Sequence, residues 1–169
     1  MTAEIRTLAA GAIALLAGAA SPEAQLRTSS RIVEQPDAPV QIVASSSEYQ
    51  KRTNEGPEGI RHELEFRSQA TQKIVAVQFG LISFDIWNEY LARLAGLATE
   101  ELNPKARKRG VWLTATDQAV GFLTAVVYVD RVRFESGEIW IADRDQILTA
   151  MRAIQKNFDP ENLVLTAKK

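Results

Sequence analysis

The feature that most constrains this chain is a strict alternation of apolar and charged residues over positions 60–67. The two faces carry, in turn, Ile60, His62, Leu64 and Phe66, and then Arg61, Glu63, Glu65 and Arg67. A period of two is typical of a half-buried antiparallel strand. A polar turn at 69–72 follows, and residues 73–84 are then apolar on both faces, as in a central strand. The sequence therefore predicts a β-hairpin within a sheet.

Further short apolar runs, separated by turn residues, predict the other strands. They lie at 31–35, 40–44, 111–116, 120–135 and 138–142. In the run at 120–135, apolar residues stand at odd positions up to Val129 and at even positions from Val132 onward. Because a one-residue slip moves every side chain to the opposite face, we expect a β-bulge near Asp130–Arg131, or a strand that passes between two sheets there.

The segment after the predicted hairpin changes to helical spacing. Asp85 suits the N-cap of a short helix over 86–95, and Gly96 stands where a C-cap belongs. The alternative is an extended strand whose tip carries Trp87 and Tyr90.

A second helix is predicted near the C-terminus. Asp143 suits its N-cap, and the helix would cover residues 144–157. Its apolar stripe consists of Ile147, Leu148, Met151 and Ile154. An isolated helix of this length is marginal in water, so we expect the stripe to pack on the remainder of the chain.

About seven short strands and few helices predict a mainly β chain folded as an antiparallel sandwich. Five runs are informative: Lys73-Ile-Val-Ala-Val-Gln-Phe, Ser83-Phe-Asp-Ile-Trp, Leu102-Asn-Pro-Lys, Gly110-Val-Trp and Tyr128-Val-Asp-Arg-Val-Arg-Phe. Through them, the block 65–143 resembles secreted bacterial immunoglobulin-like domains of uncharacterised function. The resemblance implies an immunoglobulin-like sandwich that binds or scaffolds, although the cysteine pair is missing and the C-terminal helix is an addition.

The first twenty residues predict an export signal. Residues 7–20 are apolar or small throughout and fall short of the ~20 residues that a bilayer span needs. Small residues at Ala17 and Ala19, or at Gly18 and Ala20, fit a signal-peptidase site. An uncleaved anchor or an N-terminal core helix is the alternative.

The expected organisation follows from this signal and from composition. We expect a signal peptide at 1–20, a flexible leader at 21–30, a single sandwich domain at 31–158 that includes the C-terminal helix, and a tail at 159–169. The mature chain is expected to have no transmembrane span and to be periplasmic or secreted.

Composition excludes several classes of protein. The 169 residues contain no cysteine, which excludes disulfides, thiol catalysis and cysteine-ligated metals. A formal net charge of −1 provides no field for nucleic acid, which we do not expect as a partner. The basic run 105–109 is interpreted as a solvated turn, with contact to phosphate-like anions as the alternative.

The motifs that catalysis requires are mostly missing. His62 is the single histidine and lies on the apolar face of its predicted strand, so we expect a structural role. We therefore predict no metal site and no cofactor. The alternative function is a small exported hydrolase that uses carboxylates near Asp85, Glu89 and Asp130.

The preferred hypothesis is an exported, non-catalytic interaction or scaffolding module. Its predicted binding residues are Phe84, Asp85, Trp87 and Tyr90. Aromatic side chains that are exposed together form binding patches for proteins or glycans, so we expect a protein or glycan partner in the cell envelope. The competing interpretation places these aromatic residues in the core.

Overall fold

The computed structural model describes residues 28–54 and 56–164, and this part of the chain is mainly β. A five-stranded sheet has the order β1-β7-β4-β5, with β8 added to β7, and a three-stranded sheet has the order β2-β3-β6. The strands of the first sheet are β1 (Ser29–Ile32), β7 (Phe122–Phe134), β4 (Ile74–Asp85), β5 (Tyr90–Ala98) and β8 (Ile139–Ile141). Those of the second are β2 (Val40–Gln50), β3 (Gly59–Ser68) and β6 (Arg107–Ala115). Neighbouring strands are antiparallel, except that β1 runs parallel to β7.

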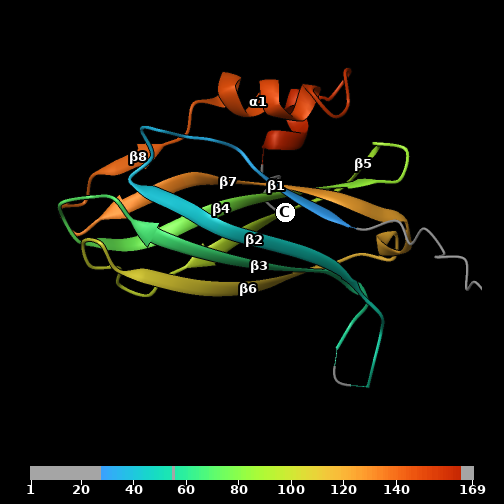
Figure 1. Cartoon of the computed structure of the whole chain (residues 1–169), viewed down its shortest axis with the longest axis horizontal. Helices are drawn as coiled ribbons and strands as arrows, with labels where there is room; N and C mark the ends of the chain where they lie inside the picture. The colour runs from blue at the N-terminus through green and yellow to red at the C-terminus, as the bar shows by residue number, and fades with distance from the viewer. Residues whose placement is uncertain (1–27, 55, 165–169) are drawn as a thin grey trace, which may run out of the picture.

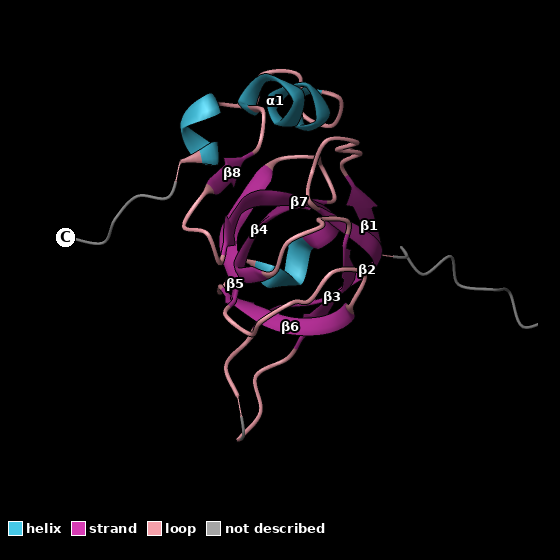
Figure 2. Cartoon of the chain, turned by 90° about the vertical axis from the view of Figure 1, so that its left-hand side faces the viewer, coloured by secondary structure: helices cyan, strands magenta, loops and turns pink. Residues whose placement is uncertain are grey.

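The two sheets pack face to face in a sandwich-like fold. Helix α1 (Arg144–Arg152) lies over the five-stranded sheet, on the side away from β2, β3 and β6 (Figure 1). Viewed from the end, the sheets curve toward each other (Figure 2), so that β1 lies beside β2 and β5 beside β6. The sequence prediction of a mainly β sandwich is confirmed at this level.

Apolar side chains fill two layers, one on each face of the five-stranded sheet. The layer between the sheets includes Leu64, Phe66, Phe79, Leu81, Val127 and Val129. The layer beneath α1 includes Ile82, Phe84, Val126, Tyr128, Ile147, Met151, Phe158 and Leu163. Strands β4 and β7 therefore bury both faces, which explains why the predicted central strand is apolar on both.

The expected bulge in β7 is present. Gln78 pairs with Arg131 and Phe79 pairs with Val129, so Asp130 has no partner of its own in β4. The extra residue reconciles the two halves of β7, because Val129 and Val132 then face the same interior layer. This prediction from the change of parity is confirmed.

The predicted helix at 86–95 is wrong, and the extended alternative is correct. Residues Tyr90–Ala98 form β5, which pairs antiparallel with β4 along its length. Asp85 does accept backbone N–H groups as a cap would, but it closes a hairpin turn. With this added strand, the described residues contain eight strands, against about seven expected.

The C-terminal helix forms but is shorter than predicted, because it ends at Arg152. Asp143 caps it by accepting the backbone N–H of Asp145 at 2.9 Å, as expected for an N-cap. The chain then turns so that Phe158 packs against Phe84 and Tyr90, with ring centroids 5.9 and 6.0 Å apart.

The ends of the folded part differ from the expected boundaries. Ser29 and Ser30 already belong to β1, whereas the sequence predicts a flexible leader over 21–30. A short 3₁₀ helix, η2 (Pro160–Leu163), follows α1, and Leu163 is buried, so the domain extends past residue 158. The predicted export signal at 1–20 lies outside the described residues. Within them, no helix is both long enough and apolar enough to cross a membrane.

Candidate functional site

The β4–β5 hairpin ends in a turn that Asp85 organises. The Asp85 carboxylate accepts the backbone N–H groups of Trp87 and Glu89, both at 2.8 Å. The backbone of Asp85 also donates to the Glu89 carbonyl and accepts from Asn88, each at 3.0 Å. Asn88 adopts a φ of 64°, which asparagine tolerates better than most residues. These bonds hold the turn in one conformation.

This turn presents Trp87 to solvent. Trp87 is 76% exposed, Ile86 is 44% exposed, and Val120 of the short 3₁₀ helix η1 (Ala119–Gly121) is 74% exposed. The Ile86 N–H donates to the Gly121 carbonyl at 3.0 Å, which brings η1 beside the turn. We call Ile86, Trp87 and Val120 the tip patch. Exposed apolar groups that adjoin in this way are typical of interaction surfaces.

The other two aromatic residues of the predicted site, Phe84 and Tyr90, pack against the segment after α1. Phe84 is fully buried and packs on Phe158, and Tyr90 is half-buried against the same ring. Of the four predicted binding residues, Trp87 offers a contact surface and Asp85 positions it, while Phe84 and Tyr90 tie the hairpin to the segment after α1. The competing interpretation, that these aromatic residues belong to the core, is thus right for Phe84.

A shallow groove of about 370 Å³ adjoins the tip patch. It lies between the hairpin turn, at Trp87, Asn88 and Glu89, and residues 154–157 after α1. Gln155 donates from Nε2 to Glu89 Oε2 at 2.6 Å and links the two walls. The groove therefore offers amide and carboxylate groups next to an exposed indole ring.

The carboxylates proposed for a hydrolase do not converge. Asp85 and Glu89 share the hairpin turn, whereas Asp130 lies on β7, eight residues beyond Phe122, the partner of Asp85. At about 3.3 Å per residue the separation is roughly 25 Å. Among the described residues, no three histidine, aspartate or glutamate side chains gather closely enough to bind a metal ion.

His62 lies on the inward face of β3, as predicted, and is fully buried. Its Nδ1 is 2.8 Å from Ser47 Oγ on β2, and its Nε2 is 3.0 Å from Thr114 Oγ1 on β6. Burial lowers the pKa of His62 to about 4. A neutral imidazole that bridges three strands, with no access to solvent, fits the expected structural role.

The basic run at 105–109 is largely a strand rather than a loop. Arg107 opens β6, and three of the four cations in the run, all of them within this strand, have an acidic partner. The pairs are Arg107 with Glu65 at 2.9 Å, Lys108 with Glu100 at 2.7 Å, and Arg109 with Glu63. This pairing neutralises the three cations within β6, whereas Lys105 lies exposed in the turn before the strand.

Sequence reasoning missed a group of arginines on the outer face of the five-stranded sheet. Arg93, Arg131 and Arg144 all approach the buried carboxylate of Asp130, at 3.7, 3.6 and 3.8 Å respectively. In the sequence, the change from odd to even apolar positions at Asp130–Arg131 marks this place in β7. Nothing local in the sequence connects these two residues with Arg93 on β5 or Arg144 on α1.

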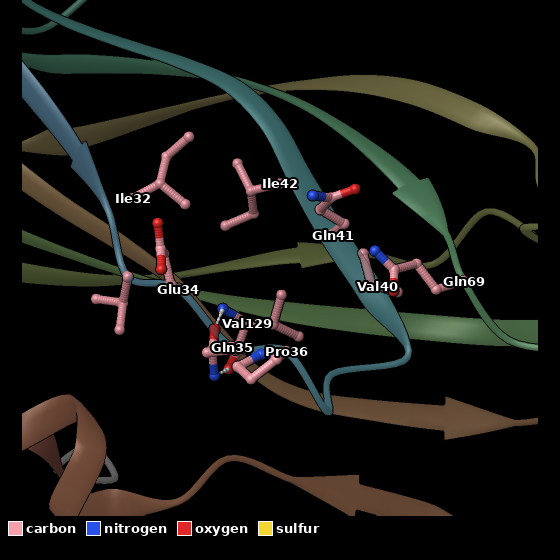
Figure 3. A pocket seen from close by; sticks show the side chains of 10 residues that line it. Ile32, Glu34, Gln35, Pro36, Val40, Gln41, Ile42, Gln69 and Val129 are labelled. Carbon is pink, nitrogen blue, oxygen red and sulfur yellow. Dashed lines mark hydrogen bonds between the residues drawn. The ribbon is translucent and has the colours of Figure 1, made fainter.

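A second hollow, of about 430 Å³, lies between β1 and β2. Figure 3 shows the side chain of Gln35 on one wall, joined to the backbone of Val129. Gln35 donates from Nε2 to the Val129 carbonyl at 2.9 Å, and its Oε1 accepts the Val129 N–H at 2.8 Å. Strand β1 pairs with β7 up to Val127, and β8 pairs with it from Arg131 onward. The Gln35 amide bonds to β7 between these two segments, so this wall of the hollow serves the pairing of the sheet.

The similarities found to known proteins are to solved structures. The chain matches no protein-family model and no curated protein. It is similar to a hypothetical protein from Peptoclostridium difficile 630, with a TM-score of 0.52 and 9% identity over 71% of this chain and 93% of that one. A Northeast Structural Genomics Consortium target gives a TM-score of 0.43, with 16% identity over 62% of this chain and 80% of that one. A DUF1425 family member from Shewanella sp. pv-4 gives 0.37, with 15% identity over 53% and 75%.

At such identities the first similarity is one of fold alone. The fold that the two chains share is that of a small β protein, and in this chain it consists of two packed sheets.

Proposed function

We propose that this chain is an exported, non-catalytic interaction module that binds a partner in the cell envelope through the tip patch. The observation that carries the proposal is the exposure of Trp87 on a turn held by hydrogen bonds from Asp85. Because the backbone of the turn is already held, binding has to order only the side chain, and tryptophan is frequent among the residues that contribute most to interfaces.

The chemistry of the patch favours a protein partner. Ile86 precedes Trp87 in the turn and Val120 lies on η1 beside it, so all three expose apolar surface in one region. Such a region gains most from a partner that brings apolar side chains of its own. A glycan is the second candidate, because the groove beside Trp87 offers the amide and carboxylate groups of Gln155 and Glu89 next to an indole ring.

Export and the immunoglobulin-like class belong to the same proposal. Export is supported by the sequence of residues 1–20. The immunoglobulin-like class is supported by two largely antiparallel sheets packed face to face and by the resemblance of the block 65–143. The hydrolase alternative lacks comparable support, since Asp130 lies far from Asp85 and Glu89.

Affinity purification from the envelope of the native host tests the proposal. The baits are the wild-type chain, Trp87→Ala and the control Val111→Ala, which removes a half-exposed apolar side chain from β6. We expect one partner to be retained by wild type and the control, and to fall about tenfold with Trp87→Ala, as for a hot-spot residue. A glycan array probed with the same three proteins separates the two kinds of partner. Equal retention by all three baits, or no partner in either format, would refute the proposal.

A further inference from the structure

The arginine group around Asp130 is a candidate site of a different kind. We propose that Arg93, Arg131 and Arg144 form a binding site for a dianionic phosphoryl group on the outer face of the five-stranded sheet. This site is separate from the tip patch, and the inference does not depend on the proposed function.

The fold brings these side chains together from three elements. The bulge in β7 places Asp130 and Arg131 next to each other beside Gln78 of β4. Arg93 comes from β5, where it pairs with Ile82, and Arg144 is the first residue of α1. The group therefore lies on the five-stranded sheet beside the N-terminal end of α1.

The Asp130 carboxylate does not satisfy the three guanidinium groups. Its one close hydrogen bond is with a neutral amide, since Gln78 Nε2 donates to Asp130 Oδ2 at 2.7 Å. The three arginines stay at 3.6–3.8 Å, beyond the usual length of a charge-assisted hydrogen bond. Asp130 Oδ1 is buried among these guanidinium groups and accepts no hydrogen bond in the described part of the chain, so their N–H groups lie near one another without a well-placed acceptor.

The lack of hydrogen-bond acceptors is most marked at Arg93. Its side chain is only 4% exposed, and its Nε and Nη1 have no hydrogen-bond partner in the described part of the chain. Its Nη2 lies 3.5 Å from the Tyr128 hydroxyl, which is a weak contact. Buried donors of a charged group are seldom left without an acceptor, so an anion or water close to Arg93 would complete the site.

The local charge favours an anion with two negative charges. Three guanidinium groups share one carboxylate, and no other carboxylate in the described residues lies within ion-pair distance of them. On the opposite sheet Arg107 and Arg109 have glutamate partners of their own. The surplus of two charges matches a phosphate monoester, whose tetrahedral oxygens accept from several arginines at once.

Solvent can reach the site from one side. The side chains of Arg131 and Arg144 are 49% and 45% exposed, so a phosphoryl group can bind them from outside while Arg93 supports it from within. Arg144 is partly fixed already, because its Nη1 donates to the Leu163 carbonyl at 2.7 Å. Binding would therefore order few additional side-chain torsions.

Calorimetric titration with inorganic phosphate at mildly alkaline pH and low ionic strength tests the site. Arg131→Gln and Arg144→Gln are suitable variants, since both side chains are half exposed and each leaves two arginines in place. We expect each variant to weaken phosphate binding about tenfold, as for loss of a charge-assisted hydrogen bond. Arg107→Gln, on the other sheet, should bind phosphate like wild type.

Binding to lipid vesicles distinguishes a phosphoryl group on a lipid from one on a soluble compound. Binding to vesicles that contain phosphatidic acid, lost with Arg131→Gln and Arg144→Gln combined, would assign the phosphoryl group to a lipid. Binding of inorganic phosphate without vesicle binding would assign it to a soluble compound. No heat of binding with phosphate up to about 10 mM, or equal affinity in Arg131→Gln, Arg144→Gln and wild type, would overturn the proposal.

Discussion

The ring of Tyr128 lies against the backbone of Gly80, its cross-strand neighbour in β4, in the space where a side chain would start. This close approach makes room for Tyr128 in the layer beneath α1, where its hydroxyl lies 3.5 Å from Arg93 Nη2. A glycine within a central strand is usually unfavourable, because it adds entropy to the unfolded chain and packs nothing. Here it makes room for a large buried ring.

Replacing Gly80 with alanine should therefore destabilise the fold. The new Cβ would overlap the Tyr128 ring, and neither the ring nor the β4 backbone can move freely, so we expect a loss of about 1–3 kcal/mol or more in the free energy of unfolding. Chemical denaturation measures it. Gly121→Ala is the matched control, because a Cβ there meets only an ordinary contact at 3.6 Å, and it should change stability by no more than about 0.5 kcal/mol. Equal stability of the two variants would contradict the packing described.

Gln35 should contribute to stability as if it were part of the sheet. Gln35→Ala removes both hydrogen bonds to the Val129 backbone and leaves a partly buried ladder group without a partner, for a cost of about 1–3 kcal/mol. Gln41→Ala serves as control, since Gln41 accepts only from Arg67 at the surface. Amide hydrogen exchange adds a local measurement: the Val129 N–H should lose protection in Gln35→Ala, and unchanged protection would argue against the bond.

His62 should make the fold less stable in acid. Its pKa is about 4 in the folded chain and near 6.5 when unfolded, so the unfolded state binds a proton first as the pH falls. The contribution of His62 is complete above pH 6.5 and is lost between pH 6.5 and 4. At about 1.4 kcal/mol for each unit between the two pKa values, the loss reaches roughly 3 kcal/mol below pH 4.

The comparison with His62→Gln isolates this effect. Glutamine should lower the melting temperature modestly at neutral pH, because it imperfectly replaces the bonds with Ser47 and Thr114, and should remove this part of the pH dependence. Partner binding should stay within a few fold of wild type. An identical acid dependence of the two proteins, or complete loss of binding with unchanged stability, would show that His62 has a different role.

The apolar stripe of the C-terminal helix should contribute to the stability of the monomer by packing on its own sheet. Ile147 on α1 is fully buried, so Ile147→Ala should cost about 2–5 kcal/mol in the free energy of unfolding. Leu148→Ala should cost less, because Leu148 is only partly buried. The thermal midpoint of both variants should not depend on protein concentration. A midpoint that rises with concentration would instead mean that the stripe is an interface between two copies.

How far the sequence predicts this structure depends on whether the pattern is local. The alternation at 60–67 and the parity change at Asp130–Arg131 are local, and both predictions are confirmed. The error at 86–95 has a physical cause, since an aspartate that accepts backbone N–H groups caps a helix and closes a hairpin turn equally well. Tyr90–Ala98 then becomes a strand because β4 offers a free edge for pairing.

The candidate sites show the same division. The sequence groups Phe84 with Trp87 and Tyr90 as exposed aromatic residues, but Phe84 is buried against Phe158, which lies far away in the sequence. The bond between Gln35 and Val129 and the approach of Arg144 to Asp130 join segments that no short motif connects. Such contacts follow from topology and become visible only in the folded chain.

The most direct test of the central claim is photo-crosslinking from the tip patch. A photoreactive phenylalanine analogue is placed at position 87 in the native host, and at position 111 on the outer face of the other sheet as control. If Trp87 contacts a partner, irradiation yields a discrete adduct from position 87 and none from position 111. No adduct from position 87, or the same adducts from both positions, would contradict the account.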